Sequence, residues 1–161
     1  MRLFIAITLS KEMKKTLVTY MHDLKKQGVE GRFVPAQNLH MTMAFIGEYE
    51  NPDKVKRVIK QVPMPPFRLT LSEQGRFGNL LWIGVKGNQK LKSYNKNLRE
   101  ALKQNNIPFD HTAFVPHITL VRKFSAKKPY HVTLPKAEMI VEKVSLMKTE
   151  MKDGKVRYRE L

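Results

Sequence analysis

The alternation of apolar and polar residues predicts a strand, a helix and a second strand in the first part of the chain. Residues 2–8 are mostly apolar on both alternating faces, which is typical of a central strand. Apolar residues then recur at helical spacing between Ser10, a candidate N-cap, and Gly28, a candidate helix end. We expect a loop from Gly31 to Asn38, followed by a strand that ends at Gly47.

The remainder of the chain carries signals for two more helices and five more strands. Asn51-Pro52-Asp53 supplies a cap, a proline for the first turn and an acid for the positive end of the helix dipole, and Pro63 stops this helix. The later elements are, in order, strands at 67–72 and 80–85, a helix between Asn88 and Asn105, a strand from His117, a long strand at 138–151, and a final strand through Tyr158 after an Asp153-Gly154 hairpin turn. Helices and strands without a dividing linker predict an α+β fold with a largely antiparallel sheet, in one domain over residues 1–161.

One short stretch occurs twice in similar surroundings. His40-Met41-Thr42-Met43 and His117-Ile118-Thr119-Leu120 both read His, apolar, Thr, apolar, and a Phe-Val-Pro sequence lies upstream of each. Alternate side chains of a strand share a face, so the His and Thr of each copy point away from the core, whereas Met41, Met43 and Phe45 face it. We therefore expect two similar lobes with pseudo-two-fold symmetry, mostly antiparallel sheets and outer helices, around a central cleft that holds His40, Thr42, His117 and Thr119.

Two imidazoles that face one cleft are suited to acid–base catalysis near neutral pH. A neutral ring can take a proton from water, and a charged ring can give one to a leaving oxygen. The hydroxyls of Thr42 and Thr119 can donate hydrogen bonds to the oxygens of a phosphate. We expect neither a metal nor a cofactor, since the surroundings of both motifs lack the carboxylates of a hydrolytic zinc site.

Charge and composition narrow the class of partner. The 161 residues include 30 Lys+Arg and 14 Asp+Glu, a net charge of +16 that favours a polyanion such as nucleic acid. The chain has no cysteine, which excludes disulfides and a thiol nucleophile. No apolar run is long enough to cross a bilayer, and the first residues do not read as a signal peptide. We expect a cytoplasmic monomer that binds RNA or nucleotides and no membrane.

The chain resembles the two-histidine phosphoesterases, in particular the RNA 2′,3′-cyclic phosphodiesterases that are also called 2′-5′ RNA ligases. The resemblance lies in the opening Arg2–Ile7, in Asn38–Glu48, in Pro116–Arg122 and in a Gly-x-x-x-Tyr pattern at Gly154 and Tyr158. It implies that the enzyme hydrolyses 2′,3′-cyclic phosphate termini to 2′-phosphates. It further implies that His40 is the proton donor to the leaving 3′ oxygen, that His117 activates water, and that Arg122 binds phosphate.

The fifth residue after each histidine differs between the two copies. It is Phe45 in the first and Arg122 in the second, so the halves are not interchangeable. In a regular strand Arg122 would face away from His117 and Thr119. The phosphate-binding role therefore requires that the strand ends or bulges before Arg122.

Three other functions fit the same sequence. The enzyme could make or break 2′-5′ RNA linkages with the same residues, or act on a small cyclic nucleotide. It could instead be a non-catalytic RNA-binding module, whose binding would depend strongly on salt. Among the remaining residues, Phe45 and Trp82 are expected in the core, and Arg32 and Lys123 are candidates for a basic rim.

Overall fold

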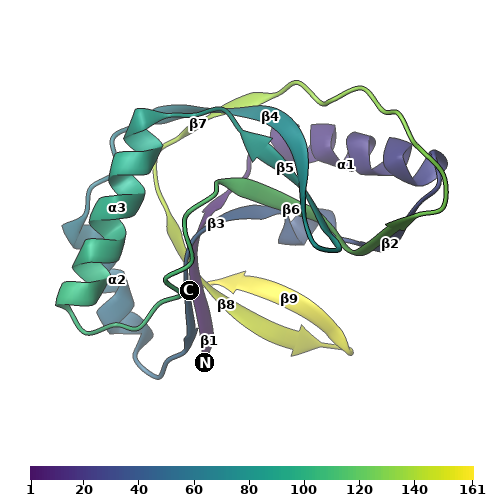
Figure 1. The fold of residues 1–161 in the computed structure, drawn as a ribbon. Coiled ribbons are helices and arrows are strands. Elements are labelled where there is room, and N and C mark those ends of the chain that lie inside the picture. The colour runs from purple at the N-terminus through teal and green to yellow at the C-terminus, as the bar shows by residue number, and fades with distance from the viewer.

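An antiparallel sheet of nine strands and three α-helices make up the fold, which the computed structural model describes over all 161 residues (Figure 1). The strands are β1 (Arg2–Thr8), β2 (Val29–Phe33), β3 (His40–Glu48), β4 (Phe67–Phe77), β5 (Leu80–Val85), β6 (His117–Ala126), β7 (Glu138–Val141), β8 (Ser145–Lys152) and β9 (Lys155–Glu160). The helices are α1 (Lys11–Lys26), α2 (Pro52–Gln61) and α3 (Gln89–Gln104), with a short 3-10 helix η1 (Ala36–Asn38) before β3. The predicted α+β class is confirmed.

The order of the strands is symmetric about the two motif strands. Eight strands follow one another as β7-β4-β5-β6-β3-β1-β8-β9, so β6 and β3 are adjacent in the middle and three strands lie beyond each. The two motif strands meet at a single antiparallel pair, Met41 with Ile118. Each of these residues directly follows its motif histidine, so the predicted pseudo-two-fold axis passes between them. The two lobes are thus the halves of one curled sheet, and they separate on either side of this pair.

The helices are exchanged between the halves. α1 precedes the first motif in sequence but lies against β2, which pairs with β6 of the second motif, and its Tyr20 is hydrogen-bonded to Gln74 of β4. α3 precedes the second motif but contacts β3, and α2 packs against α3 and β8 (Figure 1). A helix therefore does not pack in the same half as the motif strand that follows it in sequence. The exchange ties both halves to one apolar core of 33 buried residues.

Local sequence explains where the helices begin and end. The side chains of Ser10, Asn51 and Asn88 cap α1, α2 and α3 as predicted, each accepting a hydrogen bond from a backbone N–H of the first turn. The predicted hairpin turn is also present, because Asp153 and Gly154 both have positive φ, the conformation that a two-residue turn between antiparallel strands requires. None of the helices combines the length and the hydropathy needed to cross a membrane.

Two predicted segments differ from the structure. The expected loop after Gly31 overlaps β2, a strand too polar and too short to show an alternating pattern. The expected long strand at 138–151 is interrupted at residues 142–144: β7 pairs with β4 in one half of the sheet, and β8 pairs with β1 in the other. The alternation of apolar and polar residues identifies extended segments, but it does not show where such a segment leaves one neighbouring strand and pairs with another.

Candidate active site

Both motif strands contain a β-bulge at the same position. The pairing of β1 with β3 goes from Ile5–Ala44 to Ala6–Thr42, which leaves Met43 without a partner. The pairing of β5 with β6 goes from Leu81–Val121 to Trp82–Thr119, which leaves Leu120 without a partner in the same way. Each bulged residue is the third after its histidine.

The bulges decide which side chains reach the cleft. Because of the extra residue, Met43 and Ala44 are both buried, and so are Leu120 and Val121. Alternation then resumes in the opposite phase, so Phe45 and Arg122 return to the face of the motif His and Thr, and both line the same cavity. The bulge that the phosphate-binding role of Arg122 requires is therefore present. The expectation that Phe45 faces the core is wrong for the same reason.

The backbone carbonyl of each bulged residue accepts a hydrogen bond from a group outside the strand pair that contains the bulge. The buried side chain of Asn95 on α3 donates from Nδ2 to the carbonyl of Met43 over 2.7 Å. The backbone N–H of Val34 donates to the carbonyl of Leu120 over 2.8 Å. Buried carbonyls are nearly always paired, so these two donors stabilise the bulges.

The two histidine rings are oriented by the same contact. Nδ1 of His40 lies 2.7 Å from the carbonyl oxygen of Asn38, and Nδ1 of His117 lies 2.6 Å from that of Val115. A carbonyl only accepts, so Nδ1 carries the proton in both rings and Nε2 is the nitrogen that can act on a ligand. In the first motif the hydroxyl of Thr42 donates to Nε2 of His40 over 3.0 Å. The His and Thr of this motif thus converge on one point.

Aromatic side chains that were not predicted as site residues enclose both imidazoles. The ring centres of Phe4 and Tyr158 each lie 5.0 Å from that of His40. The ring centres of Phe77 and Trp82 lie 5.2 and 5.7 Å from that of His117. Trp82, expected in the core, is half-buried against this histidine. Only Tyr158 had a signal in the sequence, as the end of the Gly-x-x-x-Tyr pattern.

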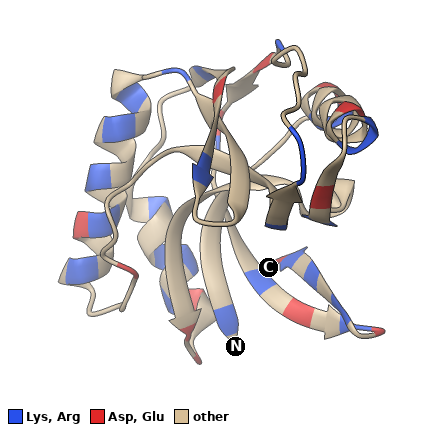
Figure 2. Cartoon of the chain, turned by 45° about the vertical axis from the view of Figure 1, so that its right-hand side comes forward, with Lys and Arg blue, Asp and Glu red and all other residues tan.

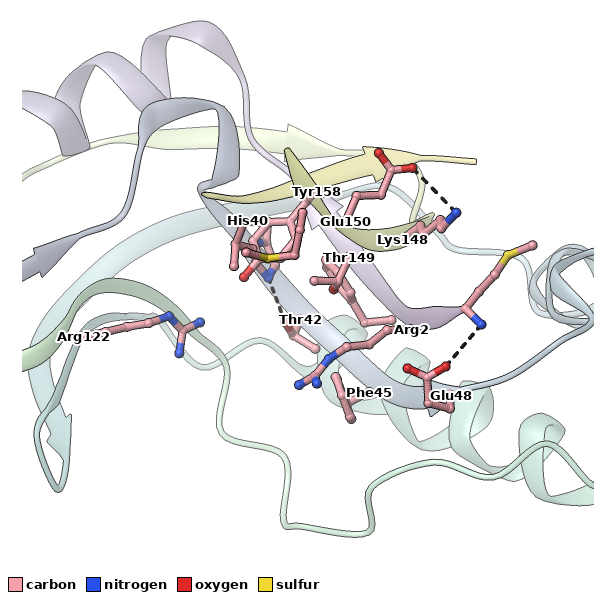
Figure 3. Close-up of a pocket in the computed structure, with 14 residues that line it drawn as sticks. Arg2, His40, Thr42, Phe45, Glu48, Arg122, Lys148, Thr149, Glu150 and Tyr158 are labelled. Atoms are coloured by element: carbon pink, nitrogen blue, oxygen red, sulfur yellow. Dashed lines mark hydrogen bonds and ion pairs between the residues drawn. The ribbon is translucent and has the colours of Figure 1, made fainter. Parts of the chain in front are cut away.

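A cavity of about 720 Å³ opens beside the first motif (Figure 3). His40, Thr42, Phe45 and Arg122 line it together with residues of β1 and of the β8–β9 hairpin. The remaining lining residues are Met1, Arg2, Phe4, Glu48, Lys148, Thr149, Glu150, Met151, Val156 and Tyr158. Arg122 comes from β6, across from the other labelled residues, and its guanidinium points toward His40 and Thr42 (Figure 3).

His117 and Thr119 do not line this cavity but lie on the adjacent strand. The Met41–Ile118 pair is antiparallel, so His40 is beside Thr119 and Thr42 is beside His117. Residues offset by two on such a pair are about 7–8 Å apart, which is the spacing this register gives His40 and His117. The fold thus brings the five predicted residues to one region. His40, Thr42 and Arg122 line the cavity, and the other two lie beside it.

The site is electropositive. Burial lowers the pKa of His40, and electrostatic repulsion from the nearby side chains, Arg122 foremost, lowers it further, against the opposing effect of the Asn38 carbonyl. Elsewhere, Lys and Arg are spread over the helices and the β8–β9 hairpin rather than gathered in a tail (Figure 2). No group of three or more His, Asp or Glu side chains is arranged to hold a metal ion.

Comparison with known proteins gives consistent matches. The family model of the 2′-5′ RNA ligase superfamily matches residues 15–153. The chain is 30% identical over 132 residues to an RNA 2′,3′-cyclic phosphodiesterase of Thermotoga maritima, over 76% of this chain and 70% of that protein. It is 28% identical over 169 residues to an RNA 2′,3′-cyclic phosphodiesterase of Escherichia coli, over 99% and 93% of the two chains. Among solved structures, that of Escherichia coli LigT complexed with 3′-AMP superposes with a TM-score of 0.83 at 28% identity, covering 99% of this chain and 94% of LigT.

Proposed function

Since the chain belongs to the 2′-5′ RNA ligase superfamily, we propose that it is a phosphoric diester hydrolase that opens RNA 2′,3′-cyclic phosphates to 2′-phosphates. Relatives that carry the name RNA 2′,3′-cyclic phosphodiesterase match over most of the chain. The observation that supports the proposal best is the pair of His-x-Thr strands, in register about one axis, in which Nδ1 of both rings is bound to a backbone carbonyl and Nε2 is the unprotonated nitrogen.

In the proposed reaction the two imidazoles move one proton each. His117 accepts a proton from water through Nε2 as the water oxygen bonds to phosphorus. The bond from phosphorus to the 3′ oxygen breaks, and protonated His40 donates from Nε2 to that oxygen. The 2′ oxygen keeps the phosphate. The two rings supply both proton transfers, so the reaction needs no metal.

The phosphate is held by the groups beside these rings. Thr42 and Thr119 donate their hydroxyls to the non-bridging oxygens, and Arg122 contributes a charged fork that matches phosphate geometry. That the similar Escherichia coli LigT is complexed with 3′-AMP supports a nucleotide as the class of ligand. Phe45 has the position in the first motif that Arg122 has in the second. The site therefore has an apolar side and a cationic side, so its two sides are not equivalent for a bound substrate.

The proton-donor role requires that His40 is charged when substrate is bound. Burial and the neighbouring cations lower the pKa of His40 in the free protein, which favours the neutral ring. A bound phosphate places a negative charge next to the ring and favours the charged form. Substrate binding therefore prepares His40 as the acid.

A substrate panel with product identification tests the proposal. Purified protein is incubated in excess chelator with a nucleoside 2′,3′-cyclic phosphate, an RNA oligonucleotide that ends in one, and a 2′-5′-linked dinucleotide. We expect both cyclic substrates to give 2′-phosphates at an unchanged rate in chelator. Loss of turnover on chelation would refute the metal-free reaction, and a 3′-phosphate product would reverse the proposed direction of cleavage.

The same panel separates the alternatives. The superfamily name points to 2′-5′ linkages, so preferential cleavage or formation of the 2′-5′ bond would favour an enzyme that makes or breaks these linkages. A non-catalytic RNA-binding module predicts salt-sensitive binding without any product. We also propose that the enzyme acts as a cytoplasmic monomer, which light scattering and cell fractionation can check.

A further inference from the structure

Arg32 and Arg122 lie directly opposite each other on neighbouring strands. β2 pairs with β6 in the register Arg32–Arg122 and Phe33–Val121. Opposite residues of an antiparallel pair share a face, with Cβ atoms about 4.5–5.5 Å apart. Since Arg122 lines the cavity beside His40, Arg32 lies on the same face, next to it. Both arginines are exposed.

The charges of this pair are not neutralised by the protein. Neither arginine takes part in any of the ion pairs of the chain. Residues 111–137, which include β6 and the segment after it, contain five Lys and Arg and no Asp or Glu. The nearest acid on β2 is Glu30, which lies opposite Ser125 instead. Like charges directly opposite one another destabilise a sheet, so the pair costs stability in the absence of an anion.

The backbone on both sides of the pair has an uncommon conformation. Gly31 has φ +142°, and a Cβ there would lie 2.7 Å from the carbonyl oxygen of Arg122. Lys123 has φ +52°, which is rare for a residue with a side chain. The β2–β6 register shifts between Glu30 and Arg32. Such features concentrate at functional sites, where the strain is offset elsewhere.

β2 carries Arg32 along the same edge of β6 that β3 occupies at the motif. β6 pairs with β3 at Ile118 and with β2 from Val121 onward, and η1 lies between the two strands in sequence. Arg32 is therefore three β6 positions beyond the position of His40, about 10 Å at the rise of a strand. A group that binds there extends away from the reacting phosphate without leaving the cleft face.

We propose that Arg32 binds a second phosphate, the diester on the 5′ oxygen of the nucleoside that carries the cyclic phosphate. Arg122 holds the reacting phosphate, and Arg32 holds the next phosphate along the RNA. The bound substrate relieves the repulsion between the two guanidinium groups. The inference rests on the proposed phosphodiesterase activity. It makes the preferred substrate an oligoribonucleotide rather than a cyclic mononucleotide.

The test compares adenosine 2′,3′-cyclic phosphate, the dinucleotide ApA with a terminal 2′,3′-cyclic phosphate, and the same dinucleotide with an uncharged methylphosphonate linkage. kcat/KM is measured for the wild type, for Arg32→Gln, and for Arg57→Gln, which removes an equal charge from exposed α2. We expect Arg32→Gln to lower kcat/KM for the charged dinucleotide about tenfold, as befits a charge-assisted hydrogen bond. It should leave the other two substrates within twofold, and Arg57→Gln should change none.

Equal loss on all three substrates would overturn the proposal, because Arg32 would then serve the reacting phosphate or the fold. No loss on the charged dinucleotide would overturn it as well. A wild type that turns over neither cyclic substrate refutes the proposed activity instead. In that case the affinity for ApA with a terminal 2′-phosphate, measured by calorimetry, decides the role of Arg32: about tenfold weaker binding by Arg32→Gln supports it, and equal binding refutes it. Thermal unfolding supplies a structural control, since Arg32→Gln should not lower Tm.

Discussion

At the scale of single residues, both catalytic candidates are oriented by the backbone two positions before them. The carbonyl groups of Asn38 and Val115 accept from Nδ1 of His40 and His117, at nearly equal distances of 2.7 and 2.6 Å. The contact fixes the tautomer, so Nε2 is the atom that each ring offers to a ligand. The rings differ in their neighbours: Tyr158 and Phe4 cover His40, whereas Phe77 and Trp82 flank His117.

This arrangement makes the protonation of His40 sensitive to Arg122. Burial is the main cause of its lowered pKa, and the charge of Arg122 adds to it. At pH 7 the ring of the free protein should therefore be neutral, becoming charged only as the pH falls below the ordinary value of about 6.5. We expect Arg122→Gln to raise the pKa of His40, because it removes a nearby positive charge.

NMR titration of the imidazole signals measures this pKa directly. Addition of a nucleoside 2′-phosphate should also raise it in the wild type, and by less in Arg122→Gln. Lys103→Gln, on the exposed last turn of α3, is the control for a general change in net charge. A His40 pKa at or above its ordinary value in the free wild type would contradict this description of the site.

At the scale of elements, the two bulges determine what the cleft contains. If β3 and β6 alternated strictly, with no bulge at Met43 or Leu120, Phe45 and Arg122 would face the core. The bulge in β3 depends on α3, since Asn95 supplies the hydrogen bond that the ladder lacks at the Met43 carbonyl. A helix from one half of the chain thereby supports the motif strand of the other.

Asn95→Ala tests this support. It should lower the free energy of unfolding by about 1–3 kcal/mol, because it leaves a buried carbonyl without a donor. Urea denaturation gives the value, with Asn97→Ala, on the exposed side of the same helix, expected within about 0.5 kcal/mol of the wild type. Equal effects of the two substitutions would show that the hydrogen bond to Met43 does not stabilise the bulge.

At the scale of the whole molecule, a sheet with an approximate two-fold axis joins two unequal copies of one motif. The axis lies at the Met41–Ile118 pair, and three further strands follow the motif strand on each side of it. The inequality comes from Phe45 and Arg122 and from β2, which extends only the β6 side. The cleft thus has a cationic end at Arg122 and Arg32.

Sequence patterns predicted the helices, most strands and the convergence of the two motifs, because caps, periodicity and the repeated His-x-Thr are local signals. They did not predict β2, the exchange of helices or the break between β7 and β8, which depend on strand partners that are remote in sequence. The bulges lie between these cases. The need for one before Arg122 could be inferred from its required direction, but its partner in β3, and hence the position of Phe45, could not.

In the proposed reaction His40 and His117 act as one catalytic unit. The most direct measurement is kcat/KM for a 2′,3′-cyclic phosphate in excess chelator, for His40→Ala, His117→Ala, the double variant and His22→Ala, an exposed control on α1. Each active-site substitution should lower kcat/KM by at least about 10²-fold, and the double variant should be little worse than either, as expected of groups that act together. Activity that survives in both single variants would show that the two histidines are not the catalytic pair.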